Sequence, residues 1–367
     1  MPKQSFSDQL ANAFVAHDVN VLRLQADQRR TLFKALKKLE AKLVKTIAAT
    51  DTETVTLARS KALLKTVRTL IDRDYATIAS THKVLLQDLA EYEFSAVGKL
   101  INREVGVSLM SIGVDEAVIK SLVSDDVVIG APLKTYWEQQ SVGLRNRFMT
   151  EMRAGVFAGE TPQQLIQRVR GTKAQNFRNG IMQTARNGAE VVTRTAAQSV
   201  LNDARMEVFK ANADVIEGVQ AQVTLDDRTS DVCIARSGFA WTLDGDPFPG
   251  TDTDEDFPGP PPWHPNCRST LLPLVKRPGQ ILKDNKLDTQ LQREVANIPK
   301  ATQASMNGQV AGELTYEQWL ETQSTATQLE VLGPGRLKLW NAGKISLRDL
   351  IDQRGNPLTL KELKARV

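Results

Sequence analysis

The sequence contains little cysteine, few aromatic residues and no long apolar segment. Only Cys233 and Cys267 occur among its 367 residues, which excludes the disulfide framework of a small secreted protein and favours a reducing compartment. No apolar run approaches the roughly 20 residues that cross a bilayer, and the first ten residues lack the apolar core of a signal peptide. We therefore expect an intracellular protein with no membrane partner.

The sequence also has little excess of either sign of charge, because 47 Lys and Arg are balanced by 43 Asp and Glu, which gives a formal net charge of +4. This balance does not by itself indicate a nucleic-acid partner. The distribution is less even, since one segment carries basic residues at helical spacing, namely Arg30, Lys34, Lys37, Lys38, Lys42 and Lys45. The basic stripe formed by these six residues is either a solvated helix face or a surface that contacts DNA phosphates.

Leu and Ala are plentiful instead, and their spacing predicts an α-rich protein. Apolar residues recur at the helical i, i+4, i+7 spacing in three stripes, near residues 32–43, 63–71 and 85–101. Asp51 and Thr52 interrupt the pattern as a turn and an N-cap. We therefore predict that residues 1–125 form an N-terminal helical bundle, which the third stripe completes.

The rest of the chain predicts a helical domain with a small β-sheet over residues 126–278, then a mostly helical C-terminal extension over residues 279–367. Pro132 and its β-branched neighbours mark the first boundary. Helices are predicted at 136–156, 165–169 and 176–213, and strands at 219–223, 239–241 and 271–275. The stretch 244–262 reads as a long loop dense in Asp, Gly and Pro. The predicted fold class is therefore α-rich α+β.

Local signals indicate where several helices end. Thr161 before Pro162 is a favourable N-cap and first-turn pair, and Thr315 has Gln318 at the capping-box position. Residues 333–335, Gly-Pro-Gly, predict a break between two helices.

Two cysteines and a histidine form a candidate metal site. Cys233, His264 and Cys267 offer two thiolates and an imidazole, and the His-x-x-Cys step is compatible with shared ligation of one Zn²⁺. An aspartate, Asp226 or Asp231, is available as a fourth ligand. Two other interpretations stay open. The thiols either pair as a disulfide or pack as small apolar groups while His264 and its neighbours hydrogen-bond the Asp-rich turn.

The Asp-rich turn itself also allows acid/base chemistry. Asp226, Asp227 and Asp231 surround Arg228. An arginine beside carboxylates is more often an ion-pair lock, and nothing in the sequence assigns a nucleophile, a base and a group that orients them. We therefore do not expect an enzyme.

Two segments resemble a known family. Residues 225–233 read LDDRTSDVC, residues 261–272 read PPWHPNCRSTLL, and together they are similar to the central motif of the phage Mu F-like head morphogenesis proteins. The residues that carry the motif are Asp226, Asp227, Arg228, Thr229, Asp231, His264, Pro265, Asn266 and Arg268. The turn at 155–161 and the Arg194-Thr195 helix resemble the lead-in of that domain, and residues 308–363 resemble its C-terminal extension. Ser269 stands where the family usually has a cysteine, so a family metal site that includes this cysteine would lack a ligand.

The resemblance implies a minor capsid and head morphogenesis protein of a tailed bacteriophage. Such a protein enters procapsids near the portal in the host cytoplasm, resides inside the virion head and affects DNA packaging or ejection. The implied partners are the portal protein, a major capsid or scaffolding protein, and packaged double-stranded DNA. No cofactor is expected apart from the structural zinc of the open alternative. Two other classes also stay open: a virion-delivered enzyme, such as a nucleotide-modifying transferase or thiol peptidase, and a DNA-binding head protein.

Overall fold

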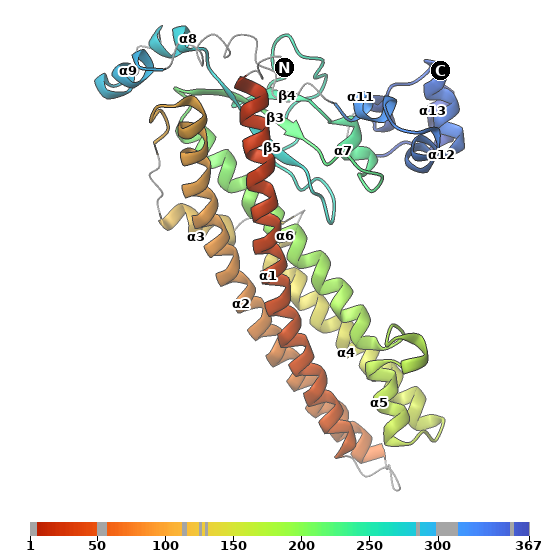
Figure 1. Cartoon of the computed structure of the whole chain (residues 1–367). Helices are drawn as coiled ribbons and strands as arrows, with labels where there is room; N and C mark the ends of the chain where they lie inside the picture. The colour runs from red at the N-terminus through yellow and green to blue at the C-terminus, as the bar shows by residue number, and fades with distance from the viewer. Residues whose placement is uncertain are drawn as a thin grey trace. The chain divides into compact units, whose positions relative to one another are not determined.

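The computed structural model has the α-rich α+β fold that the sequence predicts (Figure 1). It describes residues 6–49, 57–111, 116–124, 127–128, 131–283, 287–298, 315–352 and 356–366. The predicted turn at Asp51 and Thr52 lies outside the described residues. Within the described residues, no helix is both long and apolar enough to span a membrane.

The chain divides into two compact units, each built from separate stretches of sequence. Unit 1 comprises Met1–Val21, Ala90–Ile119 and Gln198–Val367, and unit 2 comprises Leu22–Leu89 and Lys120–Ala197. Residues of three long helices, α1 (Phe6–Ala48), α2 (Leu57–Val105) and α6 (Ile181–Ala211), belong to both units. The module boundaries near residues 125 and 278 stay predictions, since a grouping by contacts does not test where a sequence module begins.

Unit 2 is a helical bundle in which parts of α1, α2 and α6 pack with α4 (Leu133–Phe157). The predicted stripe of α1 forms part of its core, because Leu32, Leu36, Leu39 and Leu43 are all fully buried. Polar contacts also join the helices of this bundle. Lys42 of α1 pairs with Asp74 of α2 at 2.6 Å, and Trp137 of α4 donates to His82 Nδ1 of α2 at 3.1 Å.

The second and third apolar stripes lie on one helix, since α2 continues from Leu57 to Val105. No proline interrupts that segment, so its hydrogen-bond ladder can run unbroken. Further along the chain, α3 (Glu116–Ser124) is followed by two-residue strands β1 (Val127–Val128) and β2 (Ala131–Pro132), which pair before α4 begins.

Shorter elements follow α4. Helix α5 (Pro162–Arg170) has Thr161 as its N-cap, as predicted, and the Thr161 side chain accepts from the backbone of Gln164 in a capping box. The 3-10 turn η1 (Lys173–Gln175) leads into α6.

Unit 1 contains a three-stranded antiparallel sheet in the order β4-β3-β5 (Figure 1). Its strands β3 (Ile216–Gln222), β4 (Ala240–Thr242) and β5 (Thr270–Val275) confirm the three predicted strands. The central strand is the first in sequence, and Gln222 at its end pairs with Thr270 at the start of β5. The segment that follows β3 and the segment that precedes β5 are therefore neighbours.

The C-terminal segment packs against these same segments. Helices α7 (Asp231–Ala235), α11 (Tyr316–Glu321), α12 (Thr325–Asn341) and α13 (Leu360–Arg366) and the 3-10 turn η2 (Leu347–Leu350) supply residues to one buried apolar cluster. The predicted capping box of Thr315 and Gln318 is present, and Gly333 breaks the helical geometry of α12 with a φ of 70°. In sequence, helices α8 (Pro278–Lys283) and α9 (Thr289–Ala296) lie between β5 and α11.

A buried ion-pair network also holds unit 1 together. Arg205 of α6 and Glu93 of α2 are both fully buried and form a salt bridge, and Arg205 forms another with Asp18 of α1. His17 contacts the second carboxylate oxygen of Glu93 at 2.7 Å. Burial alone would raise the pKa of the Glu93 carboxyl, but the facing Arg205 and His17 lower it. The network therefore holds a charged carboxylate inside the unit.

Candidate functional site

The two motif segments meet because of the strand order. Residues 223–235 leave the end of β3 and enter α7, while the loop of residues 243–269 returns to the start of β5. Gln222 and Thr270 are paired across the sheet, so side chains only a few residues beyond them can touch. The sheet thereby brings together residues that lie about 40 positions apart in sequence.

Asp226 and Arg268 form the centre of the contact. Both guanidinium nitrogens of Arg268 donate to the carboxylate of Asp226 at 2.6 Å, which is the bidentate geometry that favours arginine over lysine. Asp226 Oδ1 also accepts from the backbone N–H of Arg228 at 3.1 Å and from the hydroxyl of Thr229 at 3.2 Å. The hydrogen bonds from Arg268 hold the pKa of the Asp226 carboxyl far below its usual range. This carboxylate is therefore committed to an ion-pair lock.

The C-terminal helices attach to the same turn. Tyr316 Oη donates to the backbone carbonyl of Asp226 at 2.7 Å. Arg336 donates to Asp231 Oδ2 at 2.7 Å and to the backbone carbonyl of Leu358 at 2.8 Å. The Asp-rich turn is thus anchored from two sides, and the sequence patterns identified neither Tyr316 nor Arg336.

Helix α6 fixes the other motif segment. Gln198 donates to the carbonyl of Ser269 at 2.7 Å, and Asn202 donates to the same oxygen at 3.3 Å. Asn202 Oδ1 in turn accepts from the backbone N–H of Leu271 at 3.1 Å. Gln198 and Asn202, which lie one turn apart on α6, therefore secure the entry to β5.

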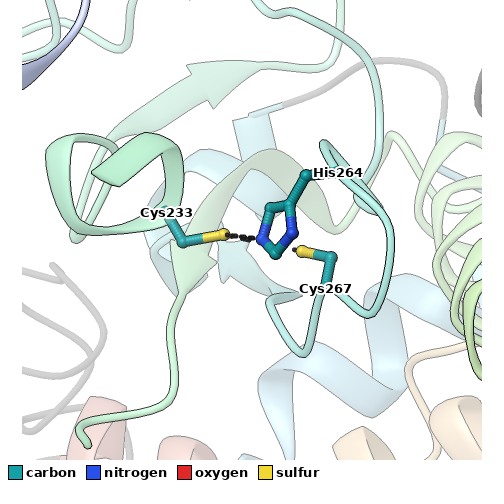
Figure 2. A group of neighbouring side chains, drawn as sticks. All are labelled: Cys233, His264 and Cys267. Atoms are coloured by element: carbon teal, nitrogen blue, oxygen red, sulfur yellow. Dashed lines mark hydrogen bonds between the residues drawn. The ribbon is translucent and has the colours of Figure 1, made fainter. Parts of the chain in front are cut away.

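Cys233, His264 and Cys267 come together beside this lock (Figure 2). Their possible ligand atoms all lie within 4.8 Å of one another, with 3.1 Å between Cys233 Sγ and His264 Nε2 and 3.5 Å between the two sulfur atoms. Both cysteines are buried and unbridged. The Cys233 side chain comes from α7, and the other two come from the last turn of the loop of residues 243–269.

The contacts within this cluster shift the pKa values of the two thiols in opposite directions. The contact with Cys233 lowers the pKa of the Cys267 thiol and raises that of Cys233. Burial alone would lower the pKa of His264, but its contact with Cys267 raises it. His264 Nδ1 lies 2.9 Å from the carbonyl of Pro265 and donates to it, so Nε2 is the nitrogen that faces the sulfur atoms. Two thiols and an oriented imidazole are a suitable donor set for a soft divalent metal ion.

The remaining predicted residues have different surroundings. Asp227 and Arg228 are exposed, and Arg228 approaches Asp226 only at 3.6 Å. Asn266 adopts a left-handed conformation with a φ of 62° at the turn between His264 and Cys267. Among the described residues, the group of potential metal ligands includes neither Asp226 nor Asp231, whose carboxylates form salt bridges with Arg268 and Arg336.

The basic stripe lies on α1. All six of its side chains are exposed on the helix. Arg30 forms a salt bridge with Asp27, and Lys42 forms one with Asp74. In the part of the chain that the structure describes, the other four residues have no acidic partner, namely Lys34, Lys37, Lys38 and Lys45.

Comparison with known proteins supports the resemblance carried by the motif. Residues 146–272 match the family model described as Phage Mu protein F like protein. No curated protein and no solved structure gives a match to the chain. The matched region includes α6, the strands β3 and β4, the start of β5, both motif segments and the Cys-His-Cys cluster, and the C-terminal extension lies beyond it. The resemblance to the phage Mu F-like family is therefore confirmed for residues 146–272, and that family is one of phage head morphogenesis proteins.

Proposed function

We propose that the chain is a minor head protein of a tailed bacteriophage. It enters procapsids near the portal, remains inside the virion head, and affects the packaging or ejection of DNA. Its partners in this proposal are the portal protein and a major capsid or scaffolding protein. The observation that carries the proposal is the family match over residues 146–272, which contains the interlocked motif.

The geometry of the motif supports an architectural role. Its charged groups bind one another, and the hollow they surround is only about 20 Å³, enough for about one water molecule. A nucleotide or a peptide needs a cleft of several hundred Å³. We infer that the motif stiffens the surface that docks in the head and that it does not turn over a substrate.

Complementation in the phage that encodes the chain tests this role. The Asp226→Asn variant loses the charge of the lock, whereas Asp227→Asn makes the same chemical change at an exposed neighbour. We expect Asp226→Asn to reduce incorporation of the chain into heads, with Asp227→Asn close to wild type. Normal incorporation with loss of a chemical activity in the Asp226→Asn phage would favour the enzyme alternative.

A second candidate function, DNA binding, is favoured by the distribution of charge between the units. The segments of unit 2 hold 25 Lys and Arg against 13 Asp and Glu, a formal charge of +12. The segments of unit 1 hold 22 against 30, a formal charge of −8. The small overall charge thus conceals a strongly basic helical bundle, on which the basic stripe lies. Packaged double-stranded DNA is the polyanion that such a surface would meet inside a head.

The salt dependence of DNA binding tests this candidate. One variant replaces the four unpaired lysines of the basic stripe by glutamine, and its control replaces four exposed lysines of unit 1, namely Lys338, Lys344, Lys361 and Lys364. Each phosphate contact contributes about 0.9 to the slope of log K against log salt concentration. The first variant should therefore reduce the slope by up to about 3.6, with the control unchanged. Equal binding by both variants would exclude the stripe as a DNA contact.

A further inference from the structure

We propose that Cys233, His264 and Cys267 bind one Zn²⁺ and that a water molecule completes its coordination. This inference concerns metal chemistry at the motif and does not depend on the proposed role in head assembly.

The distances between the three side chains fit a tetrahedral metal ion. Zinc binds sulfur at about 2.3 Å and imidazole nitrogen at about 2.0 to 2.1 Å. Tetrahedral angles then place two sulfur ligands about 3.8 Å apart and a sulfur and a nitrogen about 3.6 Å apart. The structure has 3.5 Å between the sulfur atoms and 3.1 Å between Cys233 Sγ and His264 Nε2. Movements of a few tenths of an ångström are sufficient to admit the ion.

The backbone orients the ligands independently of any metal. The N–H of Cys267 donates to the carbonyl of His264 at 3.1 Å and closes the His-x-x-Cys turn, which Asn266 makes possible with its left-handed conformation. His264 Nδ1 donates to the carbonyl of Pro265, so the Nε2 lone pair is directed at the sulfur atoms. Proteins usually orient a zinc-binding histidine in this way, by a hydrogen bond from the ring nitrogen that does not bind the metal to a carbonyl or carboxylate oxygen.

The alternatives to a metal are less compatible with the geometry. A disulfide requires a sulfur–sulfur distance of about 2.05 Å, whereas the two sulfur atoms lie 3.5 Å apart. Purely apolar packing does not account for an imidazole directed at two buried thiols.

The fourth coordination position opens into the small hollow of the motif. The hollow measures about 20 Å³, and its lining includes Cys233, His264, Ser230 and Ser269 as well as the arginines of the motif. Its volume suits one water molecule, for which the serine hydroxyls are hydrogen-bonding partners. The site is therefore a Cys₂His site whose fourth ligand is a water molecule. The ion cross-links α7 to the last turn of the long loop, next to the core that the C-terminal helices share.

Metal analysis of the full chain tests the proposal. We expect elemental mass spectrometry to find about one zinc per chain in protein purified without chelators. After removal of the zinc, added Co²⁺ should give the intense visible bands of a tetrahedral site together with thiolate-to-cobalt charge-transfer bands. Zinc below a tenth of an equivalent and no cobalt spectrum, with both thiols reduced, would overturn the proposal. A Cys233–Cys267 disulfide in protein from a reducing cytosol would also overturn it.

A designed third thiolate tests the open position. In Ser269→Cys the new thiol replaces the water, so the charge-transfer intensity per cobalt should rise about 1.5-fold, from two thiolates to three. Ser80→Cys adds a thiol at an exposed position of unit 2 and should leave the spectrum unchanged. Unchanged intensity in a folded Ser269→Cys variant would contradict the open fourth position. Because the zinc content of the wild-type chain is measured separately, poor folding of a variant leaves the test intact.

Discussion

Arg205 provides a quantitative test of how unit 1 is held together. The Arg205→Met substitution keeps most of the side-chain volume but removes the charge that faces Glu93 and Asp18. Arg205 and Glu93 are fully buried, so the variant leaves a carboxylate inside the unit with only His17 as a partner. Breaking a buried ion pair in this way costs about 3 to 5 kcal/mol, compared with 0 to about 1 kcal/mol for an exposed pair.

A double-mutant cycle separates the ion pair from the loss of packing. Glu93→Gln keeps the shape and a hydrogen-bond acceptor for His17, and we expect it to cost about 2 kcal/mol alone. The combined variant removes both buried charges, so neither is left unpaired. Its destabilisation should therefore be at least about 2 kcal/mol smaller than the sum of the two single effects. Urea unfolding followed by tryptophan fluorescence measures this, because four of the five tryptophans belong to unit 1.

Two outcomes would refute the reasoning. An Arg205→Met cost below about 1 kcal/mol would mean that the network is hydrated and contributes as an exposed pair does. Strict additivity of the two substitutions would mean that Arg205 and Glu93 do not interact energetically.

Three further perturbations have expected outcomes. Burial lowers the pKa of His82 to about 3, so below about pH 6.5 the unfolded chain binds a proton that the folded chain does not. Stability should therefore fall by about 2 kcal/mol between pH 6.5 and pH 5 in a urea titration, and His82→Gln, which still accepts from Trp137, should remove this slope. Asp226→Asn should cost about 2 kcal/mol and speed proteolysis of the loop of residues 243–269, because it weakens the bidentate contact with Arg268. Gly218→Ala should cost about 2 to 3 kcal/mol in thermal unfolding, since its Cβ would lie 2.4 Å from a backbone oxygen of β4; wild-type stability in that variant would show that the sheet shifts freely.

Local signals in the sequence predicted the elements of the fold. The apolar periodicity of α1, the strand β5 and the capping box at Thr315 all arise from neighbouring residues, and each is present in the structure. Continuity was harder to predict, because α2 carries two apolar stripes that local periodicity does not distinguish from two helices. The absence of proline between them was the available signal.

The candidate site depended on pairings that no local pattern encodes. The HPNC and DDRT segments were visible, but the bond between Asp226 and Arg268 follows from β3 being the central strand. Tyr316 and Arg336 reach the same turn from about 90 and 105 residues away. Likewise, the full charge of unit 2 is a sum over two separate stretches of sequence that the structure groups together.

The most direct test of the head-protein assignment is quantitative mass spectrometry of purified virions and empty heads of the phage that encodes the chain. Copies of the chain are counted relative to the portal subunits in each particle. We expect a few copies in both, because a protein that enters at assembly is present before DNA is packaged. Absence from both particles would contradict the assignment and favour a role outside the head.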